Sequence, residues 1–392
     1  MSVRLGLIGI RHMGANHYGN LLTLVERGEV ELVALCDTDE WSRRVPEPVG
    51  TLEEIRFRLE HAERGAGSPH LPLVHMWMQR VCDPPATMYD DYRKLLDHPG
   101  LDGVIICTPN VLHEQMVCDA LARDLPVLCE KPLGATVEQC DAMMEAERTS
   151  KGFIQVGLHM RYRQLSQTVH DLVASGRLGT MTKMYCQEYR GDWNPAATKL
   201  SRGDEPPTNW RYLQWASGGS IVEKLCHDFD IFTWWSGLAP LRVTASGGKA
   251  AFTDRETIDH AEIMVDYSGD ATLAVSLCMF SPNQPFRGRH MGLVGTDAML
   301  VLHYSDRGFA VHDYDGHTER FENVEGQTTA GRHAGNASLI QTEAFIRCIT
   351  SGEPVHADSS VGRLSVAVAQ AAETSIAEGR PVELAELGVS SG

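Results

Sequence analysis

The sequence is poor in basic residues and lacks long apolar runs. It has 35 lysines and arginines against 52 aspartates and glutamates, which gives a formal net charge of −17 at pH 7. A surface this acidic repels phosphate backbones and anionic lipid, so it argues against nucleic-acid and membrane partners. No uninterrupted apolar run exceeds about five residues, whereas a membrane-spanning helix needs roughly 20. The composition therefore excludes the usual features of a nucleic-acid-binding or membrane-spanning protein.

Closely spaced cysteines are also missing. The ten cysteines include no Cys-x-x-Cys pair, and Cys36, Cys107 and Cys129 stand inside apolar runs. Small thiols in such runs are usually buried and reduced. No signal-peptide core precedes the first apolar run, which begins at residue 3. These features predict a cytoplasmic protein without disulfides and without a metal site.

The length and the apolar pattern predict two domains. The chain has 392 residues, of which 43% are apolar and 22% charged, as in globular proteins. Over residues 1–157 short apolar runs alternate with the helical patterns 113–123 and 137–149, which is the β-α-β rhythm of a doubly wound parallel sheet. The expected strands are residues 3–8, 30–36, 104–107, 127–129 and 153–156. Residues 41–87, with a helical pattern at 52–64, interrupt this rhythm as an insertion, which fits a lid, a subunit contact or a plain surface excursion.

The rhythm changes after about residue 179. Strand patterns then follow one another without helices between them, which predicts a mostly antiparallel open sheet in a second, α+β domain over residues 158–392. The expected strands are residues 182–189, 241–246, 258–267, 271–279, 291–294 and 298–303. Two helical patterns, 339–350 and 359–378, close the chain. The predicted fold is thus an N-terminal Rossmann-type α/β domain followed by an α+β domain.

A glycine-punctuated turn follows the first predicted strand. Gly9-Ile10-Arg11-His12-Met13-Gly14 joins that strand to an amphipathic stretch. Glycines in such a turn let backbone N–H groups and a helix N-terminus approach a pyrophosphate, although a full dinucleotide fingerprint has glycine where this chain has Arg11. Asp37 ends the second strand, where a carboxylate accepts hydrogen bonds from an adenosine ribose and repels the extra phosphate of NADP. We therefore expect NAD as the cofactor, with NADP less favoured.

Polar residues follow the apolar runs at residues 104–107 and 127–129. Thr108-Pro109-Asn110 ends one of them and His113 follows in the next helical turn; a proline-set turn with Asn110 as a helix cap explains this motif equally well. The next run ends in Glu130-Lys131, two charges at the end of a buried strand. Ligands of open α/β sheets bind at such strand ends. We take all of these as candidate cofactor-binding residues, and Lys131 also as a group that polarises a substrate hydroxyl.

A later helical pattern carries three ionisable residues on one face. After Gly218-Gly219, the residues Glu223, His227 and Asp230 stand at i, i+4 and i+7. A lone helical histidine is usually structural, but one flanked by carboxylates in an otherwise apolar helix is typical of a tuned acid–base group. Zinc is the competing use of these residue types, yet the spacing matches no common zinc signature.

Taken together, these motifs resemble the glucose–fructose oxidoreductase and inositol 2-dehydrogenase family of NAD(P)-dependent enzymes. Order and spacing agree for Gly9 to Gly14 with His17, Asp37, Thr108 to His113, Glu130-Lys131-Pro132, Gly218-Gly219 to Asp230, and Glu378-Gly379-Arg380. The resemblance implies a Rossmann domain and a substrate domain whose open sheet packs into dimers or tetramers. It also implies that Lys131 polarises the reacting hydroxyl and that His227 is the general base. Glu223, where the family usually has aspartate, is the third candidate catalytic residue.

The second domain is rich in residues that suit a polyhydroxylated ring. Aromatic faces fit the CH face of a sugar, while amides and carboxylates fit its hydroxyls, although many such residues merely pack. The candidate substrate-binding residues, besides Lys131 and His227, are Arg161, Tyr189, Trp193, Asn194, Lys199, Trp210 and Arg211. Basic residues recur nearby at Lys199, Arg202, Arg211, Arg287 and Arg289, which fits an anionic substituent on the substrate or salt bridges between subunits.

Three functions compete. The first is a net dehydrogenase of a sugar, glycoside or cyclitol, working as a homo-oligomer. The second is a glycosidase that oxidises the ring, eliminates the aglycone, adds water and reduces the ketone again, with Tyr189 or His159 as an extra base. The third is a non-catalytic dinucleotide sensor, which has no need of Lys131 and His227. The sequence favours the dehydrogenase.

Overall fold

The computed structural model divides into two compact units, which are described separately. The first comprises residues 1–133, 138–159 and 330–360, and the second residues 134–137, 160–329 and 361–392. The residues that the structure describes are 2–11, 13–38, 86–191, 199–200, 208–281, 288–303, 308–322, 324 and 337–390. Most of the predicted insertion at residues 41–87, with its helical pattern at 52–64, therefore lies outside the described residues.

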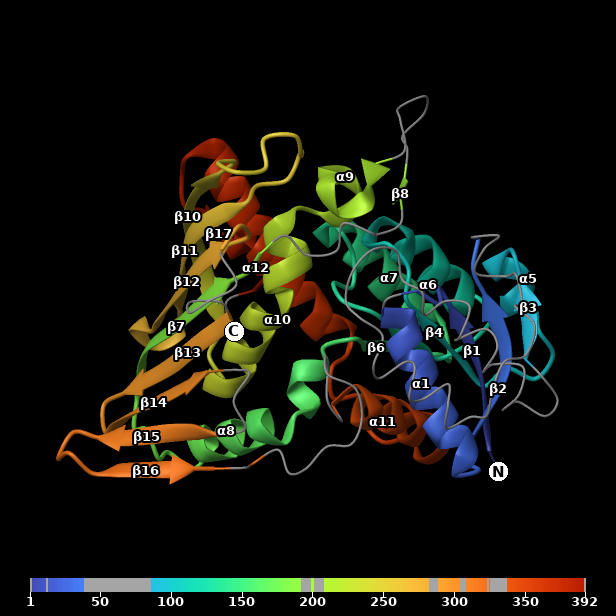
Figure 1. The fold of residues 1–392 in the computed structure, drawn as a ribbon, viewed down its shortest axis with the longest axis horizontal. Coiled ribbons are helices and arrows are strands. Elements are labelled where there is room, and N and C mark those ends of the chain that lie inside the picture. The colour runs from blue at the N-terminus through green and yellow to red at the C-terminus, as the bar shows by residue number, and fades with distance from the viewer. Residues whose placement is uncertain are drawn as a thin grey trace. The chain divides into compact units, whose positions relative to one another are not determined.

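The first unit is built on a six-stranded parallel sheet, which confirms the predicted Rossmann-type architecture (Figure 1). The strand order is β3-β2-β1-β4-β5-β6. The strands are β1 (Val3–Ile8), β2 (Val30–Cys36), β3 (Thr87–Tyr89), β4 (Gly103–Ile106), β5 (Val127–Cys129) and β6 (Ile154–Val156). Strands β4, β5 and β6 are buried along their whole length, as expected where helices cover both faces of a parallel sheet. The edge strand β3 was not expected from the sequence.

Helices cover this sheet, and one of them comes from far along the chain. The helices are α1 (Met13–Glu26), α5 (Tyr92–Leu96), α6 (His113–Leu121), α7 (Val137–Thr149) and α11 (Ala337–Ser351). Helix α11 follows the second sheet in sequence but lies beside α1 (Figure 1). Its Phe345 is fully buried in the core with Leu5 and Leu128, and its Ser338 accepts a 2.8 Å hydrogen bond from Asn20. Burial of these apolar side chains holds α11 to the first unit.

The second unit is built on a nine-stranded sheet in the order β16-β15-β14-β13-β7-β12-β11-β10-β17. Neighbouring strands are antiparallel except β7 and β12, which are parallel, so the prediction of a mostly antiparallel sheet is confirmed. The strands are β7 (Met181–Tyr189), β10 (Pro240–Gly248), β11 (His260–Tyr267), β12 (Thr272–Cys278), β13 (Gly288–Gly295), β14 (Ala298–His303), β15 (Phe309–Asp313), β16 (Thr318–Phe321) and β17 (Val382–Glu383). A short pair, β8 (Lys199–Leu200) and β9 (Thr208–Asn209), stands apart from this sheet.

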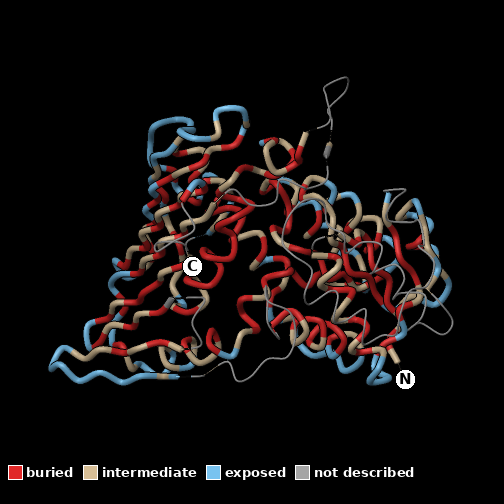
Figure 2. Tube along the Cα trace, in the orientation of Figure 1, coloured by how far each residue is buried: buried red, intermediate tan, exposed pale blue. Residues whose placement is uncertain are grey.

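Helices α8 (Gln164–Ala174), α10 (Ser220–Ser236) and α12 (Ser359–Glu378) lie on one side of the nine-stranded sheet (Figure 1). Buried and more exposed residues alternate along its strands (Figure 2). In β11, for example, Ile263 and Val265 are buried while Glu262 and Met264 are exposed. This period of two assigns one face of the sheet to the core under the helices and leaves the other face open. In the part of the chain that the structure describes, we find no helix with the length and apolar character to cross a bilayer.

Candidate active site

The glycine turn after β1 is shaped by close backbone approach. Gly9 has φ +80°, and a Cβ there would lie 2.4 Å from the carbonyl oxygen of Cys107. A Cβ on Gly14 would lie 1.9 Å from the carbonyl oxygen of Gly9. Side chains at these two positions therefore cannot be accommodated, and the turn leads directly into α1 at Met13. Such a cradle at a helix N-terminus fits the pyrophosphate of a dinucleotide.

Asp37 follows β2 and is bonded to this turn. Its Oδ2 accepts a 3.2 Å hydrogen bond from the backbone N–H of Ile10, and its side chain is half-buried. Strands β1 and β2 are parallel neighbours, so their carboxyl ends meet at the same edge of the sheet. The structure thus brings the glycine turn and Asp37 together, whereas His12 lies outside the described residues. A carboxylate in this position fits the ribose of an adenosine.

His113 connects the turns after β4 and β5. It is fully buried, with Nε2 3.0 Å from the carbonyl oxygen of Thr108 and Nδ1 3.0 Å from that of Pro132. Burial lowers the pKa of His113, and the carbonyl partners oppose that change. Pro109 precedes the short helix Asn110–Leu112, and Asn110 is buried at its start. His113 therefore fixes one turn against the other. The short helix Asn110–Leu112 and α6 begin after Pro109 and Leu112, and neither position makes a side-chain capping bond, so the interpretation of Asn110 as a helix cap is wrong.

Glu130 is buried and connects His17 to the backbone of Lys131. Its Oε1 lies 2.7 Å from Nε2 of His17 in α1, and its Oε2 accepts a 3.1 Å hydrogen bond from the backbone N–H of Lys131. Burial raises the pKa of Glu130, but the His17 hydrogen bond and the nearby His17, His159 and Lys131 charges outweigh burial and hold the pKa below its usual value. An ionised Glu130 fixes the backbone from which the half-buried Lys131 side chain extends.

In the second unit, α10 carries the predicted acid–base residues. It begins after Gly218 (φ +83°) and Gly219 (φ +105°), and every residue from Ile221 to Phe232 is buried. His227 is only 5% exposed, which removes most of the surrounding water from its imidazole. The helical spacing predicted from the sequence is thus realised, and the helix face is part of the interior and not of a solvated surface.

The two carboxylates that flank His227 on α10 each have an arginine partner. Arg161 donates to Asp230 through Nε, 2.9 Å from Oδ1, and through Nη2, 2.6 Å from the same oxygen. Burial raises the pKa of Asp230, and the Arg161 guanidinium works against that rise. Arg211 donates from Nε to Oε1 of Glu223 at 3.2 Å. Both acids are therefore held by bonded guanidinium groups.

A second buried ionic network lies behind α10, and sequence analysis missed it. Nε of Arg289 lies 3.0 Å from Oε2 of Glu188 and 2.7 Å from Oδ1 of Asp228, and Lys224 lies 3.4 Å from Glu188. Burial raises the pKa of Glu188, but the charges of Arg289, Lys224 and Arg190 lower it well below the usual range. Arg289 was a candidate for an anionic substrate group, and its charge is instead bonded inside the unit.

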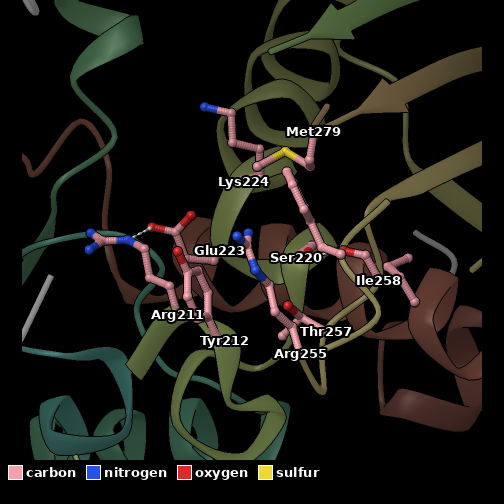
Figure 3. Close-up of a pocket in the computed structure, with 10 residues that line it drawn as sticks. Arg211, Tyr212, Ser220, Glu223, Lys224, Arg255, Thr257, Ile258 and Met279 are labelled. Atoms are coloured by element: carbon pink, nitrogen blue, oxygen red, sulfur yellow. Dashed lines mark hydrogen bonds and ion pairs between the residues drawn. The ribbon is translucent and has the colours of Figure 1, made fainter. Parts of the chain in front are cut away.

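A pocket opens at the first turn of α10 (Figure 3). It encloses about 410 Å³, including the part open to solvent. The Arg255 guanidinium lies 3.8 Å from the ring centres of both Tyr212 and Phe252, and the Arg211 guanidinium lies 4.3 Å from that of Trp210. The pocket is lined by Arg211, Tyr212, Ser220, Glu223, Lys224, Phe252, Arg255, Thr257, Ile258 and Met279. Arg255 and Phe252 were not singled out from the sequence.

The remaining predicted residues are distributed differently. Tyr189 donates to or accepts from Ser276 at 3.1 Å on the open face of the sheet, whereas its neighbour Glu188 points to the α10 side. The structure therefore does not bring Tyr189 together with His227. Lys199 lies in β8, but its side chain, like all of Trp193, Asn194, Arg202 and Arg287, falls outside what the structure describes. Trp210 is buried beside Arg211. Among the described residues, no cluster of three or more His, Cys, Asp or Glu side chains is arranged to hold a metal ion.

The glycine cradle, the parallel sheet and the polar strand ends define a Rossmann-type dinucleotide-binding unit joined to an α+β unit. The description "Oxidoreductase family, NAD-binding Rossmann fold" matches residues 78–158, and "Oxidoreductase family, C-terminal alpha/beta domain" matches residues 170–384. The chain therefore belongs to the Gfo/Idh/MocA family of NAD-binding oxidoreductases, as its motifs predicted. The glycine turn and Asp37 precede the matched ranges, so the geometry above supports their assignment independently.

Relatives of known name cover the chain to different extents. Inositol 2-dehydrogenase 2 of Saccharopolyspora erythraea is 23% identical over 393 residues, covering 98% of this chain and 97% of that protein. The 2,7-anhydro-N-acetylneuraminate hydratase of Mediterraneibacter gnavus is 26% identical over 161 residues, 41% of this chain and 40% of that protein. A solved structure of levoglucosan dehydrogenase with NADH and levoglucosan has a TM-score of 0.76 at 17% identity and covers 98% of this chain and all of that one. That structural likeness shows a shared fold.

Proposed function

We propose that this protein is an NAD-dependent oxidoreductase that oxidises or reduces a secondary hydroxyl of a sugar, glycoside or cyclitol ring. The observation that carries the proposal is that buried Glu130 fixes the backbone of Lys131, at the edge of the sheet where the glycine turn lies. The names of the relatives, an inositol dehydrogenase and a levoglucosan dehydrogenase, support a polyhydroxylated ring as substrate.

In this proposal each residue has a defined task. The glycine turn and Asp37 bind the dinucleotide, and the nicotinamide supplies a hydride acceptor or donor when it is bound. The Lys131 ammonium hydrogen-bonds the reacting hydroxyl and stabilises developing alkoxide charge, while His227 accepts the hydroxyl proton. Glu223, held by Arg211 one helical turn before His227, orients the helix face on which that histidine stands.

We also propose that NAD is preferred over NADP, because the Asp37 carboxylate is held against the glycine turn, where we expect the adenosine ribose to bind. Its bond to the Ile10 N–H fixes its position there. A fixed negative charge repels the 2′-phosphate of NADP.

The pocket beside α10 supports an anionic substituent on the substrate. Of its cationic lining residues, Arg211 is paired with Glu223 and Lys224 with Glu188, so we assign the anionic substituent to Arg255, which stacks on Tyr212 and Phe252. The N-terminal turn of α10, which carries Ser220 into the same pocket, adds the positive end of the helix dipole. A carboxylate on the ring fits this surrounding better than a neutral group does.

The glycosidase is retained as the second candidate function. One relative is named as a hydratase of an anhydro sugar, a reaction with no net redox change. Such a cycle uses the same cofactor, Lys131 and His227, so only the products separate the two functions.

The deciding experiment incubates the enzyme with trace NAD and a panel of neutral and anionic polyols, sugars and glycosides, with products identified by mass spectrometry. A ketone that grows in step with NADH establishes the dehydrogenase and identifies its ring. Free sugar and aglycone in large excess over the trace NAD establish the glycosidase instead. If neither the ketone nor free sugar and aglycone appear and the protein still binds NAD, the result favours the sensor function and the proposal fails.

Variants test the two catalytic roles. Lys131→Ala and His227→Ala should abolish turnover while the affinity for NAD, measured by titration, changes little. Lys151→Ala and His317→Ala are matched controls on the exposed surface and should retain turnover. Wild-type rates in either catalytic variant would remove that residue from the mechanism.

We further propose that the open face of the nine-stranded sheet pairs with a second copy of the chain. This face carries the exposed Met264, 45% accessible, beside polar residues of β11. Light scattering after size exclusion should show a dimer or tetramer, and Met264→Arg should weaken it. A monomer at micromolar concentration would refute the proposed pairing of two sheets.

The cytoplasmic location remains a prediction from composition.

A further inference from the structure

The start of α10 is capped by a residue from another helix. Gly219 precedes α10 and has no side chain with which to cap its first N–H groups. Glu373, in α12, supplies the acceptor: its Oε1 lies 3.0 Å from the backbone N of Ile221. A Cβ on Gly219 would lie 2.2 Å from that oxygen, so the glycine is required for the carboxyl group to reach the helix.

Gln214 completes this arrangement. It belongs to the short helix α9 (Gln214–Ser217), and its Nε2 donates to the carbonyl oxygen of Gly218 at 3.1 Å. The same amide hydrogen-bonds the Glu373 carboxyl group. Gln214, Gly219 and Glu373 together fix the conformation of the two residues that precede α10. We refer to these three residues as the α10 cap.

We propose that Glu373 is a positioning residue, which acts through the first turn of α10 to set the places of Glu223 and His227. Glu223 stands directly in that turn, because its backbone N–H bonds the carbonyl oxygen of Gly219 at 3.0 Å. Its side chain holds Arg211 and lines the pocket. A displaced first turn would therefore move the pocket lining and, one turn later, His227. The catalytic consequence rests on the proposed function, whereas the structural one does not.

The α10 cap should respond to pH near neutrality. Burial raises the pKa of Glu373 to about 7, and the hydrogen bonds from Ile221 and Gln214 oppose that rise. The ionisable residues of α10 are Glu223 and Lys224 near its start and Cys226, His227, Asp228 and Asp230 further along, and Glu256 accepts a 2.6 Å hydrogen bond from the backbone N–H of Gln214. Helix α9 has none, and α12 has no other within one turn of Glu373.

The raised pKa of Glu373 decides whether the α10 cap is more stable at low or at high pH. The closed cap binds the proton more tightly than an opened cap, in which Glu373 has its ordinary pKa of 4.5. The cap is therefore firmest when Glu373 is neutral, and it loosens as the pH rises through 7. From pH 6 to pH 8 the equilibrium constant for closure should fall about tenfold.

Amide hydrogen exchange of the full-length protein with NAD bound tests this directly. In the wild type, protection of the Ile221 amide should fall about tenfold between pH 6 and pH 8, after correction for intrinsic exchange. Glu373→Gln, which mimics the neutral acid, should keep its protection over that range. Glu373→Ala should lose protection at every pH, and Glu378→Gln, an exposed residue of the same helix, should behave as the wild type.

Activity supplies the second readout. Glu373→Ala should lower kcat with the affinity for NAD unchanged, and Glu373→Gln should restore kcat and remove the limb near pH 7 from its pH profile. Unchanged Ile221 protection in Glu373→Ala would overturn the proposal whatever the substrate. Lost protection with unchanged kcat would overturn the positioning role and leave a structural cap. If the wild type turns over nothing in the substrate panel, the proposed function fails while the exchange data still decide the cap.

Discussion

Replacing Arg161 by methionine tests whether its charge serves the fold or the substrate. Its guanidinium bonds Asp230 at 2.6 and 2.9 Å, and the two side chains are 8% and 1% exposed. Methionine retains much of the side-chain volume but leaves the Asp230 carboxylate buried without its counter-ion. Removing one partner of a buried pair costs about 3–5 kcal/mol of unfolding free energy. At roughly 2–4 °C per kcal/mol for a domain of 150–250 residues, the melting temperature should fall by about 6–20 °C.

The pH dependence of this loss identifies its cause. Burial raises the pKa of Asp230, and removal of Arg161 takes away the charge that opposes the rise. A carboxyl group with a raised pKa in the folded state makes the protein less stable as the pH increases. The loss of unfolding free energy in Arg161→Met should therefore be larger at pH 8 than at pH 5. Urea unfolding at both pH values measures it. In an Asp230→Asn background, where no charge is stranded, the same substitution should cost about 1 kcal/mol or less.

A control and a contrary outcome complete the design. Arg148 makes a similar 2.6 Å pair with Glu145, but the two side chains are 70% and 64% exposed. Arg148→Met should therefore cost less than about 1 kcal/mol. A cost this small for Arg161→Met, together with a raised KM for the substrate, would refute the structural role and favour the substrate-binding role expected from the sequence.

Three further substitutions test the first unit. Gly14→Ala places a Cβ 1.9 Å from the Gly9 carbonyl oxygen and should weaken NAD binding at least about tenfold in a fluorescence titration; Gly19→Ala in the same helix, with no atom within 4 Å of its Cβ, should bind as the wild type. Asp37→Ala should narrow the preference for NAD over NADP in steady-state kinetics, and unchanged selectivity would remove Asp37 from the ribose site. The lowered pKa of Glu130 means that its ionised form stabilises the fold above pH 4.5 and that this stability is lost as the pH falls. Glu130→Gln should therefore unfold less steeply with falling pH than the wild type, as measured by acid unfolding curves.

Local pattern was sufficient for much of the fold. The apolar runs that predicted strands at residues 3–8, 30–36 and 127–129 form β1, β2 and β5 with those bounds. β5 is buried along its whole length and β1 and β2 along most of theirs, and that burial is what their mostly apolar character encodes. The helical spacing of Glu223, His227 and Asp230 likewise follows from the chain, because the α-helical period is fixed by the backbone.

Partners distant in sequence were beyond this reasoning. Arg161 and Asp230 are 69 residues apart, and Glu188 meets Arg289 only because β7 and β13 are neighbours in the sheet. The period of a strand shows that Glu188 and Tyr189 face opposite ways, but not which of them faces α10.

The sequence therefore predicted many of the elements, their order and the residue types available for chemistry, because these depend on local periodicity and spacing, whereas β3, β15 and β16 were found only in the structure. The tertiary structure decided what each charge pairs with. It joined α11 to the first unit through Phe345, paired Asp230 with Arg161, and brought Glu373 to the start of α10. These pairings depend on which buried surfaces meet, and a buried charge is stable only where packing supplies its partner.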